Sequence, residues 1–344
     1  MSLSRRRALG LAVSAGLVAC RPPALKTEAK AGPIDTARLA REFPALAQRA
    51  RPGAFALGVM NLSTTETWYW NTDRGFPLSG AAAAPIAAAA MAQVDLGQLR
   101  LDQPVTFDAL DLSPQPSLIA HDFPTPPAGR QTTMTATNLI SLALHEADST
   151  AIDVLMKRVG GPGAVSAFLD QKDVTGLRVD RYRREIEVEM FGMPPFQPDW
   201  KEAVAFDAAR DLVAPGQRQA AMERAIVDLR DTATVPAALG FLALLAGAQL
   251  VSAASTARLL GWMSNGPPGL FAAGLTGAVN VARASGAAPA DLGFVTATTE
   301  LAIVTVGGGR RYALAGFLVG STATDAGRAG LFADAARLAM VAIG

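Results

Sequence analysis

The sequence predicts an α/β fold of the α+β type, in which an antiparallel sheet with flanking helices is interrupted by an inserted all-helical lobe. Two strand-like stretches lie near the N-terminus and several more follow residue 275, whereas residues 81–171 are largely helical with no strand pattern. Strands at both ends of a chain indicate one sheet layer built from the two termini. That layer is expected from residues 35–79 and 231–344, and the helical lobe from residues 80–230.

Composition is typical of a globular protein with a substantial core. Of 344 residues, 50% are hydrophobic and 18% are charged, which excludes disorder for most of the chain. The net charge is +1, and it becomes −2 without the first 20 residues, which hold three arginines and no acid. This balance gives no indication of nucleic-acid binding.

The first 20 residues are predicted to be a lipoprotein signal peptide. Ser4-Arg5-Arg6-Arg7 precedes an apolar run, and Leu17-Val18-Ala19-Cys20 matches a bacterial lipobox whose cysteine is the only one in the chain. The alternative is an ordinary signal peptide followed by a free, buried Cys20. Residues 21–34 read as a tether. We therefore expect an exported protein, held at the membrane by a lipid on Cys20 and facing the periplasm or the cell exterior. The paired arginines leave export by the twin-arginine or the general route open.

The first elements are a helix over Asp35–Ala50 and strands over Phe55–Leu62 and Thr67–Asn71. Phe76–Met91 follows, with two runs of four alanines. Alanine favours helix and lets other elements approach closely, so we place this helix at the centre of the fold.

The middle of the chain is predicted from turn signals and helical spacing. Leu101–Arg130 holds six prolines and reads as an irregular connection. Helices are expected over Met134–Leu144, Ser149–Val159 and Gly163–Gln171. Glu185–Arg218 reads as an inserted loop rich in aromatics and methionines, which we expect to pack on its own domain; a binding surface is the alternative.

The C-terminal part of the chain is predicted to contain three helices and four strands. A helix capped by Thr234 is expected to run to Ala248 and another over Ser255–Asn265, and Asp325–Ile343 is a closing helix. Gly307-Gly308-Gly309 is expected to be a hairpin turn. The four strand-like runs are Val279–Arg283, Leu292–Thr298, Leu301–Val306 and Tyr312–Val319.

The order of segments around the alanine helix resembles the class A β-lactamases and related penicillin-recognising serine enzymes. Phe55–Leu62 and Thr67–Asn71 precede it, and Gln93–Val105 (Q-V-D-L-G-Q-L-R-L-D-Q-P-V) follows it. The resemblance covers about residues 35–343 and implies the class A architecture. In that family F-P-x-x-S-x-x-K carries the nucleophilic serine and a lysine at the head of this helix.

This chain departs from the family at each reacting group. Keeping Phe76, Pro77 and Pro85 in register places Gly80 at the serine and Ala83 at the lysine. The nearby hydroxyl of Ser79 is expected to point elsewhere, and no S-x-x-K occurs anywhere in the chain. Without the nucleophile there is no acyl-enzyme.

Two further motifs are degenerate. At the position of S-D-N stand Ala147, Asp148 and Ser149, and the resemblance implies a mostly structural role for the aspartate. After Asp180-Arg181-Tyr182 the general base is replaced by Arg183, and a cation cannot take a proton.

The K-T-G motif aligns with Ala284-Ser285-Gly286, so the lysine is lost while a hydroxyl and a glycine remain. Arg283 is expected on the other side of the strand by the period-two rule. Among these positions, Asp148, Ser149, Ser285 and Gly286 are the candidate binding residues, and Gly80, Ala83, Ala147, Arg183 and Ala284 are the degenerate catalytic ones.

We interpret the chain as a lipid-anchored, non-hydrolytic pseudoenzyme that binds or scaffolds an unidentified ligand or protein in the cell envelope, with no cofactor and no metal. The alternative is a divergent serine hydrolase with weak β-lactamase activity through Ser79, Ser149 or Ser285. Other enzyme classes lack their motifs, since there is no H-E-x-x-H, no G-x-S-x-G and no phosphate loop. An acid/base role for His145-Glu146 is a weaker alternative to a helix-end histidine beside a solvated glutamate.

Overall fold

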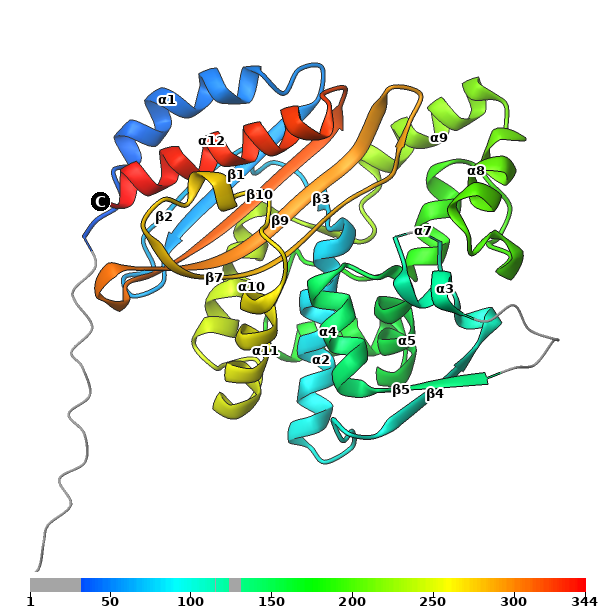
Figure 1. Ribbon diagram of the computed structural model, residues 1–344. Helices are drawn as coiled ribbons and strands as arrows, with labels where there is room; N and C mark the ends of the chain where they lie inside the picture. Colours follow the sequence, from blue (N-terminus) through cyan, green and yellow to red (C-terminus); the bar gives the residue numbers. More distant parts are fainter. Residues whose placement is uncertain (1–31, 115, 124–130) are drawn as a thin grey trace, which may run out of the picture.

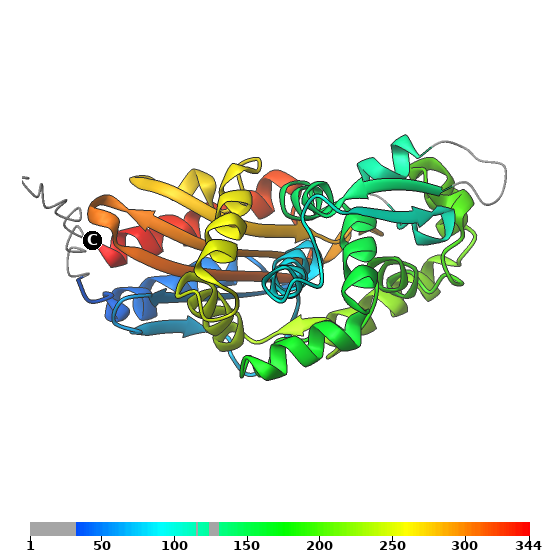
Figure 2. The ribbon, with the colours of Figure 1, turned by 90° about the horizontal axis from the view of Figure 1, so that it is seen from below.

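The computed structural model describes residues 32–114, 116–123 and 131–344. The predicted signal peptide, Cys20 and most of the predicted tether lie outside these residues. The sheet with its covering helices and the helical lobe lie side by side in the molecule (Figure 1, Figure 2).

The main sheet is antiparallel and draws its strands from both ends of the chain, as predicted. Its order is β2-β1-β10-β9-β7, with the short β8 paired to β9. The strands are β1 (Ala54–Asn61), β2 (Thr67–Trp70), β7 (Ala278–Ala287), β8 (Ala290–Asp291), β9 (Phe294–Val306) and β10 (Arg311–Ser321).

One strand prediction is wrong, because β9 is continuous where two runs were expected. The polar residues Thr299 and Glu300 lie inside it and are buried. Backbone N–H groups of Leu270 and Phe271 donate to the Glu300 carboxylate, which allows an acidic residue to stay in a buried strand. The glycine turn at 307–309 between β9 and β10 is confirmed.

Helices cover both faces of the sheet. On one face lie α1 (Thr36–Gln48) and α12 (Asp325–Ile343), which enclose a core of phenylalanines and aliphatic residues. On the other lie α10 (Val235–Ala246) and α11 (Ala253–Asn265), with Gly58 of β1 leaving room for the side chains of α10. Thr234 caps α10, as predicted.

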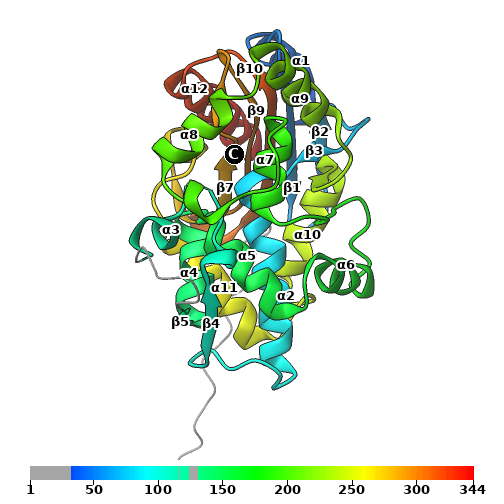
Figure 3. The same ribbon diagram turned by 90° about the vertical axis from the view of Figure 1, so that its right-hand side faces the viewer.

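The alanine helix is central, as predicted. It begins as the 3₁₀ turn η1 (Ser79–Ala82) and continues as α2 (Ala83–Asp95), whose first nine residues are buried. Figure 3 shows α2 among the other helices of the lobe, and it packs on α4, α5, α6 and α11. The short strands β3 (Phe76–Pro77) and β6 (Thr232–Ala233) pair where the chain enters and leaves the lobe.

The lobe is helical, but it contains a two-stranded hairpin that was not predicted. Strand β4 (Pro104–Asp108) lies in the stretch expected to be irregular, and it pairs with β5 (Gln131–Thr135), so that Met134 belongs to a strand and the next helix begins at Ala136. The remaining elements of this part are η2 (Ala109–Asp111), α3 (Leu118–Asp122), α4 (Ala136–His145), α5 (Ser149–Val159) and α6 (Pro162–Gln171).

The inserted segment is helical rather than a loop. It comprises α7 (Arg183–Met190), η3 (Pro198–Trp200), α8 (Ala203–Asp211) and α9 (Pro215–Val227). Its methionines and aromatics form a small core of their own, as the packing interpretation predicted (Val188, Met190, Phe191, Met193, Phe206 and Met222). The Arg181 and Asp231 side chains, 50 residues apart in sequence, form an ion pair of 2.6 Å that closes the segment at its base.

Candidate functional site

Three of the five predicted degenerate positions, Gly80, Ala147 and Arg183, line one groove of about 590 Å³ between the sheet and the helical lobe, whereas Ala83 and Ala284 do not. The groove is lined by Gly80 of η1, by Glu146 and Ala147 before α5, by Arg183 at the start of α7, and by residues 283 and 285–287 of β7.

The nucleophile position has no room for a side chain. A Cβ on Gly80 would lie 2.8 Å from the Ala147 Cβ and 2.8 Å from the Ser285 carbonyl oxygen. Real Cβ contacts are longer, so a side chain requires the walls to move. Ala83, at the lysine position, is buried inside α2. Ser79 has a φ of 50°, is buried, and lines a second cavity rather than the groove.

The second motif is structural. Asp148 caps α5 by accepting from Ala151 N at 2.8 Å, and it also accepts from Ser117 Oγ at 2.9 Å and Ile119 N at 3.1 Å. Burial raises the pKa of its carboxyl despite these hydrogen bonds. Ser149 is fully buried, and neither residue lines the groove. Of the four candidate binding residues, only Ser285 and Gly286 face it.

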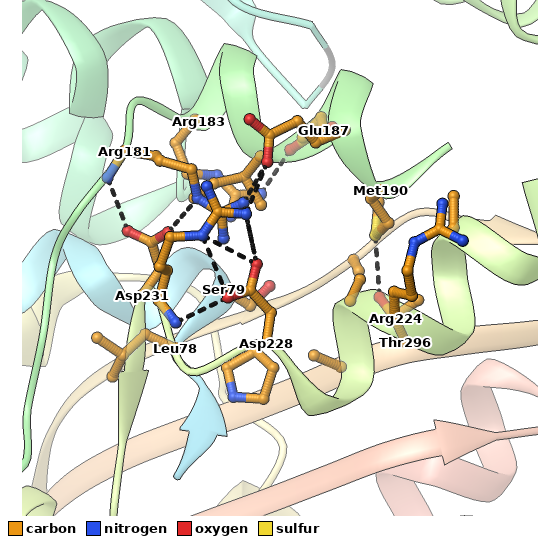
Figure 4. Close-up of a pocket in the computed structure, with 18 of the residues that line it drawn as sticks. Leu78, Ser79, Arg181, Arg183, Glu187, Met190, Arg224, Asp228, Asp231 and Thr296 are labelled. Carbon is orange, nitrogen blue, oxygen red and sulfur yellow. Dashed lines mark hydrogen bonds and ion pairs between the residues drawn. The ribbon is translucent and has the colours of Figure 1, made fainter. Parts of the chain in front are cut away.

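Arg183, at the position of the general base, is neutralised by a buried ion pair. Its guanidinium lies 2.5 Å from Glu187 one turn along α7, and both side chains are almost completely buried (Figure 4). Burial raises the pKa of Glu187 to about 7. The start of α7 is fixed by Asp153 of α5, which accepts from the backbone N–H groups of Arg183 at 2.6 Å and Arg184 at 3.1 Å.

The strand motif holds one correction. Arg283 and Ala284 lie on opposite faces of β7, as the period-two rule requires. The face that lines the groove, however, is the one that carries Arg283 and Ser285, whereas Ala284 is buried on the other face. Arg283 Nη1 donates to Ser285 Oγ at 2.8 Å, and its Nε donates to the Pro267 carbonyl at 2.8 Å. Desolvation lowers the pKa of this arginine. The groove therefore keeps a cation, although not from the lysine position.

The His145-Glu146 pair is accounted for by helix-end packing. The ring Nε2 of His145 lies 2.7 Å from the Trp262 carbonyl and its Nδ1 lies 3.2 Å from Ser141 Oγ. Both ring nitrogens are occupied, which favours the structural interpretation of this histidine.

Sequence reasoning missed three buried carboxylates around the groove. Asp153 and Glu187 hold α7, and Glu300 lies beneath Arg283 with its pKa raised to about 7 by burial. The four-residue spacing of Arg183 and Glu187 on a helix was a usable signal for their pairing. Nothing in the spacing of Asp153 or Glu300 indicates the distant backbone that each binds.

Within the described ranges there is no cluster of three or more residues suited to hold a metal ion. None of the helices described combines the length and hydropathy of a bilayer span.

Comparison with known proteins supports the resemblance to the β-lactamases. A model of the beta-lactamase enzyme family matches residues 38–343. The chain is 27% identical to beta-lactamase VEB-1 of Pseudomonas aeruginosa over 132 residues, a stretch that covers 38% of this chain and only 42% of that enzyme.

Solved structures show the same fold. A beta-lactamase from Chitinophaga pinensis DSM 2588 superimposes with a TM-score of 0.70 at 23% identity, covering 89% of this chain and 99% of the other. A class A beta-lactamase representing the last common ancestor of Gram-negative bacteria superimposes with a TM-score of 0.68 at 24% identity, covering 89% and 99%.

Proposed function

Because this chain belongs to the beta-lactamase enzyme family, we propose that it is a pseudoenzyme whose groove binds a carboxylate-bearing ligand of the cell envelope without hydrolysing it. The observation that carries this proposal is the packing of Gly80 against Ala147 and β7, which leaves no space for a nucleophile. Acyl transfer by a serine enzyme needs that nucleophile first.

The remaining groups of the groove suit binding better than proton transfer. No lysine lines it, Arg183 occupies the place of the base, and the Ser285 hydroxyl accepts a hydrogen bond from Arg283. A hydroxyl held by a guanidinium is well placed to donate to an anion, and a guanidinium pairs with carboxylates by direct hydrogen bonds. These two residues are the proposed anchor for the ligand carboxylate.

Hydrolysis is tested with nitrocefin turnover and with covalent labelling by a fluorescent penicillin on purified residues 32–344. We expect neither above background. Turnover that saturates with substrate, or a labelled band removed by excess benzylpenicillin, would overturn the pseudoenzyme proposal.

Non-covalent binding is tested by calorimetric titration with benzylpenicillin as a carboxylate-bearing probe. We expect Arg283→Ala to weaken its binding about tenfold or more, as expected for loss of a charged hydrogen bond. Arg258→Ala changes an exposed arginine of α11 and is the matched control. Equal binding by both variants contradicts the proposed anchor.

The serine hydrolase alternative has less support, since Ser149 is fully buried and Ser79 is only 8% exposed. A fluorophosphonate probe with Ser79→Ala, Ser149→Ala and Ser285→Ala variants separates the two functions. The pseudoenzyme proposal requires that no labelling depends on any of these serines.

Lipid anchoring through Cys20 is a further part of the proposal, and it is supported by the arginines, the apolar run and the lipobox of the first 20 residues. Metabolic labelling of the full chain with an alkyne fatty acid should give a labelled band that Cys20→Ser abolishes. A label retained by Cys20→Ser would refute the assignment.

A further inference from the structure

The loop that follows α11, over residues 266–271 (G-P-P-G-L-F), is a thin wall between the groove and a smaller cavity of about 350 Å³. Residues 267–269 of this loop line both spaces, and so does Arg283. Glu300 of β9 lines the smaller cavity but not the groove. The proposed anchor for the ligand carboxylate therefore has a buried carboxylate on its far side.

Three side chains of the sheet meet under this loop. Ser285 of β7 and Glu300 of β9 are directly paired, and Arg283 stands two residues before Ser285, so the three side chains lie on one face of the sheet. A Cβ on Gly269 would overlap Glu300 Oε1 and would lie 2.5 Å from Arg283 Cδ. The carboxylate and the stem of the arginine therefore lie under the same point of the loop.

The arginine and the glutamate both hold the loop by its backbone. Arg283 donates to the Pro267 carbonyl through Nε, at 2.8 Å, and through Nη2. Glu300 Oε2 accepts from the backbone N–H groups of Leu270 and Phe271, whereas its Oε1 is buried and has no hydrogen-bond partner among the described residues. Within those residues, Arg283 is the only cation that favours the ionised form of Glu300.

The charge of Arg283 is compensated only when Glu300 is ionised. Burial raises the pKa of Glu300 to about 7, although the hydrogen bond from Leu270 and the charge of Arg283 act in the opposite direction. An anion that binds Arg283 from the groove opposes the ionisation of Glu300, because it adds a second negative charge beside the same cation. By thermodynamic reciprocity, protonation of Glu300 must strengthen the binding of that anion by the same factor.

We propose that Glu300 is a positioning residue that couples the groove to pH: it holds Arg283 and the loop in place, and it takes up a proton when a carboxylate-bearing ligand binds Arg283 and Ser285. The ligand does not touch Glu300, and no covalent step is involved. This inference rests on the proposed function of the groove. A carboxylate-bearing ligand should therefore bind more tightly below neutral pH than above it.

Three other titratable groups lie at the groove and need separate tests. Glu146 lines the groove and acts on the charge of Arg283 from the exposed side. His145 also lines the groove, with both ring nitrogens occupied. Glu187 is the ion-pair partner of Arg183, which lines the groove as well. No further charged side chain of the described residues acts on the Arg283 and Glu300 pair.

Proton uptake is measured by calorimetric titration of residues 32–344 with benzylpenicillin, in two buffers of different ionisation enthalpy. For a tenfold coupling between ligand and proton, the parent should take up about half a proton at pH 7.5, and its Kd should weaken about eightfold from pH 5.5 to pH 8.5. Binding without net uptake and with the same Kd at both pH values overturns the coupling and leaves the proposed function standing. No binding at any pH overturns the proposed function and this inference with it.

Four variants assign the proton to a residue. Glu300→Gln still offers an acceptor to the loop but cannot titrate, so it should bind benzylpenicillin without uptake and without the pH dependence. His145→Gln, Glu146→Gln and Glu187→Gln should keep the uptake, whatever they do to affinity. The matched control is Glu223→Gln, which changes an exposed carboxylate of α9 and should behave as the parent does.

Thermal melting without ligand verifies that each variant is folded. Uptake that persists in folded Glu300→Gln overturns the assignment, and so does uptake that disappears in any of the other three variants. If Glu300→Gln does not fold, the parent and those three variants still decide, because an unchanged uptake in all four leaves Glu300 as its source and a loss in any of them refutes it.

Discussion

Gly80 and Gly286 meet backbone to backbone across the groove: a Cβ on Gly286 would lie 2.5 Å from both the N and the Cα of Gly80. The two residues hold the nucleophile position of the first motif and the glycine of the last. Strand β7 therefore lies directly against the turn that begins α2. Under the proposed function, this contact adds to the missing hydroxyl as a reason to expect no acyl transfer.

The contact predicts that Gly80→Ser is destabilising. The new side chain must displace Ala147 or the Ser285 carbonyl, and overpacking of this kind costs about 1–3 kcal/mol. Chemical denaturation measures the change, and nitrocefin turnover should stay at background. The control is Gly163→Ser in α6, where nothing lies within 4 Å of an added Cβ. A Gly80→Ser protein as stable as the control would show that the nucleophile position is open.

The buried ion pair between Arg183 and Glu187 predicts strong non-additivity. Arg183→Met or Glu187→Leu alone leaves one uncompensated buried charge and should cost roughly 3–5 kcal/mol, whereas the double variant should lie close to the parent. A double-mutant cycle in urea gives the coupling energy. Additive losses would mean that the two side chains act through packing alone.

The same pair predicts a pH effect on the single variant. Without Arg183, the buried Glu187 is stabilised in its protonated form. Arg183→Met should therefore be less destabilising at pH 5 than at pH 8. An equal cost at both pH values contradicts the assignment of Glu187 as the partner.

Burial of Glu300 makes stability depend on pH in the whole protein. Its folded pKa of about 7 lies above the ordinary glutamate value of 4.5, so between these values the native state binds more protons than the unfolded state. The protonated Glu300 therefore makes its full contribution to the free energy of unfolding below about pH 4.5. This contribution is lost as the pH rises through 7. Glu187 acts in the same direction.

Glu300→Gln should reduce this decline, because glutamine accepts the same backbone hydrogen bonds without titrating. Denaturation midpoints from pH 4.5 to 8 measure the slope. The control is Glu223→Gln, which alters an exposed carboxylate of α9. A slope identical in the parent and in Glu300→Gln would remove Glu300 as its source.

Local patterns in the sequence predicted the elements that are stabilised locally. The cap at Thr234 and the glycine turn of the hairpin depend on neighbours within a few residues, and the helix over the alanine run follows from the helix propensity of alanine itself. The inserted helices were missed because the methionines and aromatics of α7, α8 and α9 gain their partners from one another and from β9, not from the local sequence.

The groove, too, was predictable from the sequence only where local patterns determine it. Motif positions could be placed from the sequence, but the closure of Gly80 depends on Gly286 from the other end of the chain, which no local spacing reveals. Similarly, the break expected at Glu300 is absent because the partners of its carboxylate, at Leu270 and Phe271, come from a separate loop. Buried polar residues are predictable only when their partners are near in sequence.

Restoring every lost group should fail to restore catalysis. The variant Gly80→Ser, Ala83→Lys, Ala147→Ser, Arg183→Glu and Ala284→Lys supplies nucleophile, proton relay, base and anchor. Ala83 and Ala284 are each 1% exposed, so both new lysines enter sites that hold a methyl group. The new glutamate would lie beside Glu187 without the cation that compensates it.

We therefore expect the five-fold variant to fold, to be less stable than the parent and to show no nitrocefin turnover. Circular dichroism, thermal melting and the nitrocefin assay test the three parts. The matched comparison is the same variant with Glu187→Gln, which removes the carboxylate repulsion and should recover part of the lost stability. If the five-fold variant instead melts above the parent while remaining folded, the pocket was never reorganised around small apolar side chains, contrary to this expectation.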